Sequence, residues 1–267
     1  SVINLRNEII STSPARASRG YLVPKKMRRA FEFIGPLTSC VAFVAFAVVY
    51  LVSAQAVLLL PRGGTLTSLQ RYRSASKCMA STHAVIVVAA AFYELSGVAF
   101  GTWEYLAPNS QLQSHVMDIS TAYFIADSAH MLLWKITDVG FHLHHVLCIA
   151  YAMSCRYGAQ RGGVTVLLAC ALGELTNPTQ GLLWIVQQLK YERVIAILFP
   201  AFVAMLIVIR CVVTPLMSIA IVVALWRSGE LLFRAWGGMC IFINIGGVLF
   251  TLGQVKALRK MWADKVE

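Results

Sequence analysis

The chain has 267 residues, of which 58% are hydrophobic and only 13% are charged, and its mean hydropathy is +0.69. Soluble domains usually carry about a quarter charged residues, so this composition excludes an ordinary soluble globular protein and predicts a multi-pass membrane protein. Lys and Arg number 23 against 12 Asp and Glu, but the basic residues lie mostly between apolar runs, where they meet lipid headgroups, and we expect no nucleic-acid partner.

Residues 1–33 form a basic N-terminal arm, in which Glu8 is the only acid as far as Arg29. A segment that carries Ser and Arg but few acids is typical of the region around an organellar presequence cleavage point. An arbitrary start of the sequence explains the same pattern equally well. Because polar termini are seldom ordered unless something holds them, we expect the membrane surface or a protein partner to hold this arm.

Seven apolar segments follow the arm, and a helix needs about 20 residues to cross a bilayer. The segment at 141–157 is short, so we expect it to enter the membrane obliquely. The sixth apolar run continues beyond 213, and Pro215 predicts a bend followed by a partly re-entrant or interfacial piece, or else two short helices. The fold class is therefore all-α, a multi-pass transmembrane helical bundle of about seven spans. The expected spans are 34–60, 80–103, 116–134, 141–157, 163–189, 194–213 and 236–255.

Ionisable and amide side chains are concentrated between Val116 and Leu189, inside otherwise apolar segments. A charged group at the centre of a membrane helix costs about 2.5 to 3.5 kcal/mol on insertion scales, so such groups persist where they face a shared polar interior or do chemistry. The proline after Asn177 frees a backbone carbonyl that a cavity can satisfy. We therefore predict one intramembrane cavity. Its expected lining residues are His83, Glu94, Asp127, His130, His145, Glu174, Asn177 and Arg210.

A structural role for the same side chains stays open. His83 would then be an interfacial residue near the start of a helix, and Arg210 would neutralise Glu174 or Asp127. Asn177 would bond across to a neighbouring helix.

No metal site or cofactor is expected. The seven cysteines contain no C-x-x-C pair and lie mostly in apolar segments, as small buried hydrophobes do. The histidines at 142, 144 and 145 are clustered, but only His142 and His145 share a helix face, and no carboxylate partner is evident.

Five fragments, in the same order along the chain, resemble the TLC-domain family of membrane proteins, which includes the ceramide synthases. The last fragment is Arg210 with Pro215, similar to an Arg and a following Pro in a late helix of the non-synthase branch. The first four are K-C-M-A-S-T-H-A at 77–84, A-Y-F-I-A-D at 122–127, H-H-V at 144–146 and G-E-L-T-N-P-T-Q-G-L-L-W at 173–184. The resemblance implies a TLC-like domain at 73–260, preceded by the first span and a loop at 34–72 and followed by a tail at 261–267.

The chain also departs from the synthase pattern. Ceramide synthases carry the paired histidine and then H-D-x-x-D; here the pair is His144-His145, but the later segment keeps one acid, Glu174, and lacks the second His and acid. Acyl transfer to an amine needs a base, which His145 with Glu174 or Asp127 would supply. The resemblance therefore leaves His144, His145, Asp127 and Glu174 as candidate catalytic residues without assigned roles.

Three functions follow from these observations. We favour binding or regulation of membrane lipid without catalysis. The alternatives are an accessory structural subunit of a large organellar complex, for example in the mitochondrial inner membrane, and a ceramide-synthase-like N-acyltransferase that uses acyl-CoA. The sequence does not decide between the mitochondrial inner membrane and the endoplasmic reticulum, and Lys and Arg flank both ends of the spans, so they do not orient the chain.

Overall fold

The computed structural model describes residues 25–96, 103–136 and 139–263. The chain divides into two units, residues 1–34 and 35–267. Of the first unit, the described part is the start of the first helix. Most of the expected N-terminal arm (1–24) and the end of the expected tail (264–267) lie outside the described residues, so what holds the arm stays a prediction.

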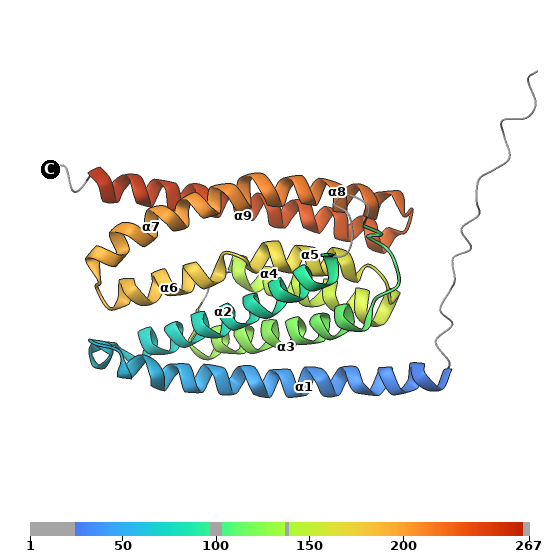
Figure 1. Ribbon diagram of the computed structural model, residues 1–267, viewed down its shortest axis with the longest axis horizontal. Coiled ribbons are helices and arrows are strands. Elements are labelled where there is room, and N and C mark those ends of the chain that lie inside the picture. The colour runs from blue at the N-terminus through green and yellow to red at the C-terminus, as the bar shows by residue number, and fades with distance from the viewer. Residues whose placement is uncertain (1–24, 97–102, 137–138, 264–267) are drawn as a thin grey trace, which may run out of the picture. The chain divides into compact units, whose positions relative to one another are not determined.

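Within the described residues the chain forms seven helical segments, of which only the fifth is interrupted, and no β-strand (Figure 1). A short 3₁₀ turn, η2 (Gly63–Thr65), lies between the first two segments. The seven segments correspond one for one to the expected spans, and the prediction of an all-α, multi-pass bundle of about seven spans is confirmed. Their elements are α1 (Lys25–Ala56) with η1 (Val57–Leu59), α2 (Ser68–Leu95), α3 (Gln111–Leu133), α4 (Val139–Met153) with the π-helical η3 (Ser154–Ala159), α5 (Gly163–Glu174) with α6 (Asn177–Gln188), α7 (Glu192–Leu206) with the π-helical η4 (Ile207–Val213) and α8 (Thr214–Arg227), and α9 (Leu231–Ala263).

Four of the described helices are long and apolar enough to cross a membrane without help from their neighbours. They are Thr38–Leu59, Ser68–Leu95, Glu192–Arg227 and Leu231–Ala263. The remaining segments are shorter or more polar, and they carry most of the ionisable side chains discussed below. Such segments depend on neighbouring helices to cover their polar faces.

The second helix begins earlier than expected. We expected this span to begin at about residue 80, but α2 begins at Ser68. Thr67 caps the helix: its side chain accepts a hydrogen bond from the backbone N–H of Gln70, and the Gln70 side chain accepts one from the backbone N–H of Thr67. This capping box satisfies two backbone donors that would otherwise lack partners. The expected end of this span, residues 97–102, lies outside the described residues.

The sixth segment does not break where we expected. The helix continues without interruption from Glu192 to Arg227, although we expected its span to end near Val213; a re-entrant or interfacial course for the second half stays a prediction. A π-helical turn at Ile207–Val213 precedes Pro215, which lies in the first turn of α8. Proline is tolerated in a first turn, and a π-turn shifts the hydrogen-bond register there, so the chain continues without a stop. α9 likewise extends beyond both ends of its expected span.

The helix pair α5–α6 does break at the predicted place. α5 ends at Glu174, and α6 begins at Asn177 with Pro178 in its first turn. The polar side chains and the break therefore coincide.

α2 lies at the centre of the bundle and packs against α3, α5 and α6, while α8 packs along α9 (Figure 1). α2 and α6 come closest at Gly181, where a Cβ atom would lie 2.9 Å from Ser81 Oγ and 3.1 Å from the carbonyl oxygen of Lys77. Small residues allow such close approach between membrane helices. This contact brings the Lys77 end of α2 against the polar start of α6.

Candidate functional site

A cavity of about 330 Å³, here called the large cavity, lies among α2, α3, α4, the α5–α6 junction, η4 and α9. Five of the eight predicted lining residues border it, together with the candidate catalytic residue His144. These six are Asp127, His144, His145, Glu174, Asn177 and Arg210. Side chains from separate helices therefore converge on one space, as the sequence pattern predicts.

Asp127 on α3 has two side-chain partners. Ser76 on α2 donates a hydrogen bond of 2.7 Å to its Oδ1, and His145 Nε2 on α4 lies 3.6 Å from its Oδ2. The other ring nitrogen of His145 lies 3.1 Å from Ser128 Oγ. Both His145 and Ser76 are buried, so this network joins three helices at the cavity wall.

Glu174 at the end of α5 is held in a similar way. The Asn177 side chain donates a hydrogen bond to its Oε2, and His83 Nδ1 lies 3.5 Å from the same oxygen. His83 is completely buried, stacks on Tyr123 at 4.0 Å between ring centroids and contacts Ser120 at 3.0 Å. His83 therefore supports Glu174 from behind and does not itself border the large cavity.

Arg210 on η4 bridges the break between α5 and α6. Its Nη2 donates to the carbonyl oxygen of Gly173 and to Thr176 Oγ1. In an unbroken helix that carbonyl would accept from the backbone N–H of Asn177, but the last carbonyls of a helix have no intrahelical partner. The arginine supplies the missing donor, and it also borders the cavity.

Five polar residues that border the large cavity were not among the predicted lining residues: Ser76, Lys77, Tyr123, Thr176 and Gln180. Lys77 lies outside the expected span at 80–103, and α2 includes it because the helix begins at Ser68. The Thr67–Gln70 capping box is the signal that would have found it. Gln180 follows Asn177 by one turn, a spacing that places both on one helix face.

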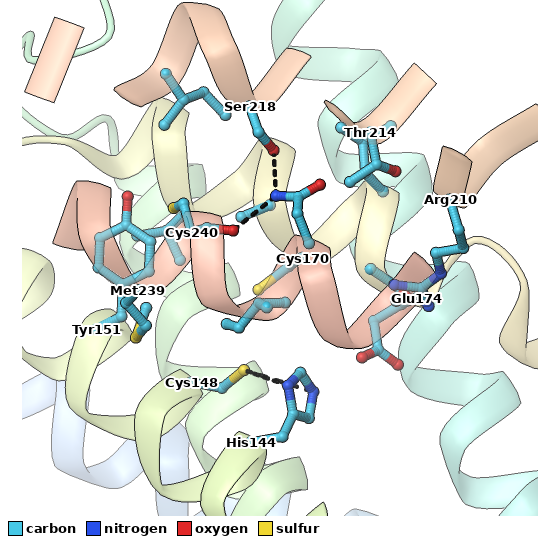
Figure 2. A pocket seen from close by; sticks show the side chains of 18 of the residues that line it. His144, Cys148, Tyr151, Cys170, Glu174, Arg210, Thr214, Ser218, Met239 and Cys240 are labelled. Carbon is cyan, nitrogen blue, oxygen red and sulfur yellow. Dashed lines mark hydrogen bonds between the residues drawn. The ribbon is translucent and has the colours of Figure 1, made fainter. Parts of the chain in front are cut away.

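A smaller inner cavity of about 70 Å³ adjoins the large one. The two share Phe124, His144, Glu174 and Arg210 among their lining residues. Figure 2 shows Glu174 and Arg210 on the same side of the inner cavity, with His144 beside Cys148. The remaining lining is mostly apolar or cysteine, and includes Tyr151, Val166, Cys170, Ile221, Met239 and Cys240.

The inner cavity also contains a polar group on α9. Asn244 donates to Ser218 Oγ at 2.8 Å and to the carbonyl oxygen of Cys240 at 2.7 Å (Figure 2). Its own Oδ1, like the Thr214 hydroxyl, is buried and has no hydrogen-bond partner within the described part of the chain. Both residues line the inner cavity, so this space offers hydrogen-bonding atoms as well as apolar surface.

Exposed residues of α4 and α9 are among those that border the large cavity. Phe141 on α4 is 45% exposed, and Phe242 on α9 is 56% exposed. Gly246 borders the cavity as well and is exposed. We call Phe141, Phe242 and Gly246 the portal residues, because an outer face of membrane helices meets lipid.

Besides His83, two predicted lining residues lie elsewhere. Glu94 accepts a hydrogen bond of 2.9 Å from Gln113, between α2 and α3. His130 contacts the hydroxyl of Tyr50 on α1 at 2.8 Å. Neither borders either cavity.

The predicted cluster of polar residues also contains groups that satisfy one another at a distance from the cavity. Asp118 accepts from Tyr157 at 2.7 Å and from Arg156 at 3.3 Å, and His142 Nε2 lies 2.9 Å from the carbonyl oxygen of Ile136. Within the described residues, no group of three His, Cys, Asp or Glu side chains is placed to hold a metal ion.

Comparison with known proteins identifies the fold family. The model of the TLC domain matches residues 73–256. The TLC domain-containing protein At5g14285 of Arabidopsis thaliana is 28% identical over 153 residues, which are 53% of this chain and 58% of that protein. The chain thus spans less than two thirds of this curated relative. No solved structure matches the chain significantly. Because the family model covers more than half of its length, the chain belongs to the TLC-domain family of integral membrane proteins.

Proposed function

We propose that this TLC-domain membrane protein binds or regulates a membrane lipid through the large cavity, without catalysis. The observation that carries the proposal is the convergence of five polar side chains from separate helices on one cavity of about 330 Å³, which exposed residues of α4 and α9 also border. The five are Asp127, His145, Glu174, Asn177 and Arg210. Ligand sites are typically concave and mostly apolar, with a few convergent polar groups.

The energetics favour a ligand over a purely structural role. Replacing a buried ion pair by packed apolar side chains is often neutral or stabilising, so a bundle that needed only stability would gain little from these charges. Here Asp127, Glu174 and Arg210 border one space, and among the described residues the arginine is not paired with either carboxylate. A polar ligand would contact these side chains when it occupies that space.

The portal residues provide the route. A lipid can move sideways from the bilayer between α4 and α9, because Phe141 and Phe242 border the cavity and are exposed. Such lateral entry needs no passage through water.

The test uses a variant that fills the portal. Gly246 borders the cavity, and a Cβ atom there would meet nothing within 4 Å, so Gly246→Phe should fold and place a ring in the opening. Gly253→Phe is the matched control, because Gly253 lies on the same helix in open surroundings and borders neither cavity.

Purified protein is analysed by native mass spectrometry in mild detergent. We expect the unmodified chain and Gly253→Phe to retain lipid, and Gly246→Phe to retain several-fold less. Equal lipid retention by Gly246→Phe and Gly253→Phe would contradict the proposal.

Acyl transfer is the second candidate, and the contact of 3.6 Å between His145 and Asp127 at the cavity wall is the observation that favours it. A carboxylate beside an imidazole orients it as a general base. Purified protein incubated with a long-chain base and acyl-CoA should form an N-acyl product if this function is present, and His145→Ala should abolish the product. Absence of product above the blank would remove this candidate.

A further inference from the structure

The anionic and cationic side chains that border the large cavity differ in their partners. Asp127 and Glu174 each have at least two contacts with neutral or imidazole groups. Lys77 and Arg210 border the same cavity, yet among the described residues neither lies within ion-pair distance of a carboxylate. Each carboxylate thus has one hydrogen-bond donor and a nearby imidazole, whereas neither cation has a carboxylate within ion-pair distance among the described residues.

Of the two cations, Lys77 has fewer side-chain partners. Its backbone carbonyl packs against α6 near Gly181, which fixes where the side chain starts. No hydrogen bond or ion pair of its ammonium group is found within the described part of the chain. An ammonium carries three donors, and inside a bundle these groups need an acceptor.

Arg210 is held by hydrogen bonds, but some of its N–H donors have no acceptor among the described residues. Both of its hydrogen bonds leave from Nη2, to Gly173 and Thr176. A guanidinium has five N–H donors in a planar fork, so Nη1 and Nε stay available. The two bonds hold the plane in place before any ligand arrives, which lowers the entropy lost on binding.

Neutral donors border the same cavity. Gln180 and Asn177 both border the large cavity, and the Asn177 amide already faces Glu174. Two cations with amide groups beside them are suited to an oxyanion, because oxyanions accept several hydrogen bonds and charge-assisted bonds are the strong ones.

We infer that Lys77 and Arg210 form an oxyanion subsite, so that the lipid of the proposed function carries an anionic headgroup, a phosphate or a carboxylate. The headgroup binds at the Lys77 and Arg210 wall, and the hydrocarbon part extends toward the portal residues or the inner cavity. This inference rests on the proposed function. The competing structural explanation is that the two cations only balance the charges of Asp127 and Glu174 across the cavity.

The experiment titrates the purified full chain, in neutral detergent, with lipids that differ only in the anionic group. Dioleoyl phosphatidic acid is compared with dioleoylglycerol, and oleate with oleyl alcohol. Inorganic phosphate and glycerol phosphate test whether the anionic group binds without a hydrocarbon chain. Binding is followed by native mass spectrometry.

We expect at least one anionic lipid to bind about tenfold or more tightly than its uncharged partner, since a hydrogen bond to a charged group contributes about 1.5 to 3 kcal/mol. Lys77→Gln should remove this preference, and Lys77→Arg, which keeps the charge, should restore most of it. Lys256→Gln is the control, because Lys256 is an exposed lysine on α9 that borders neither cavity.

The outcomes separate the two proposals. Equal affinity for charged and uncharged lipids, or a preference that survives in well-folded Lys77→Gln, would overturn the oxyanion subsite and leave lipid binding intact. Binding of phosphate but of no lipid, weakened by Lys77→Gln, would support the subsite and contradict the lipid function. Absence of binding in every arm would contradict both.

Discussion

Asp127 is the side chain on which most of the cavity wall depends, because it joins Ser76 on α2 to His145 on α4. Asp127→Ala removes the acceptor of the buried Ser76 hydroxyl and the carboxylate beside His145. Leaving buried polar groups without partners costs about 1 to 3 kcal/mol, and we expect the free energy of unfolding to fall by that amount. Unfolding in mixed micelles, followed by circular dichroism, measures it.

Glu230→Ala serves as the comparison for this prediction. Glu230 pairs with Arg161 at an exposed site, and exposed ion pairs contribute at most about 1 kcal/mol. If both substitutions destabilised the protein equally, the Asp127 network would have no special role in the wall.

At the level of single residues, the sequence predicted the cavity lining well where a polar side chain lies deep in an apolar run. Asp127, Glu174 and Arg210 were found in this way, and all three border the cavity. Glu94 and His130 lie in equally apolar runs but have side-chain partners on neighbouring helices. Periodicity within one helix does not show which neighbour a face will meet, so these two could not be distinguished from the others.

The start of α2 depends on its cap. Thr67→Ala should lower stability by about 0.5 to 2 kcal/mol, as loss of an N-cap side chain usually does, and should speed hydrogen exchange of the first-turn amides. Ser68→Ala is the neighbouring control, since the Ser68 side chain has no hydrogen bond within the described residues. Unchanged exchange in Thr67→Ala would show that packing alone sets the start of α2.

The contact between α2 and α6 tests how tightly the cavity is built. At Gly181 a Cβ atom would come within 2.9 Å of Ser81 Oγ and 3.1 Å of the backbone of Lys77. Overpacking costs about 1 to 3 kcal/mol, so Gly181→Leu should destabilise the protein and, by moving Lys77, weaken lipid retention. Gly253→Leu, in open surroundings on α9, should do neither; thermal unfolding with lipid analysis checks both variants.

It was easier to predict that a helix exists than to predict where it begins and ends. Every apolar run became a helix, and the break before Pro178 occurs where expected. Pro215 was expected to have the same effect and does not, because a π-turn precedes it and α7 to α8 run as one helix. Whether a proline breaks a membrane helix depends on what its neighbours provide, and a single sequence does not contain that information.

For the whole molecule, membership of the TLC-domain family and the all-α architecture followed from composition and five short fragments, and the family match at 73–256 confirms the resemblance. The sequence could predict many of the residues that line the cavity, but not the shape of the cavity. Its opening between α4 and α9 depends on how helices far apart in the sequence pack, which local patterns do not specify.

A density map of the full chain in lipid nanodiscs tests the central claim most directly. The account predicts elongated density inside the large cavity, with one end against Lys77 and Arg210 and the other leading out between Phe141 and Phe242. A cavity closed by packed side chains, with lipid density confined to the outer surface of the bundle, would contradict it.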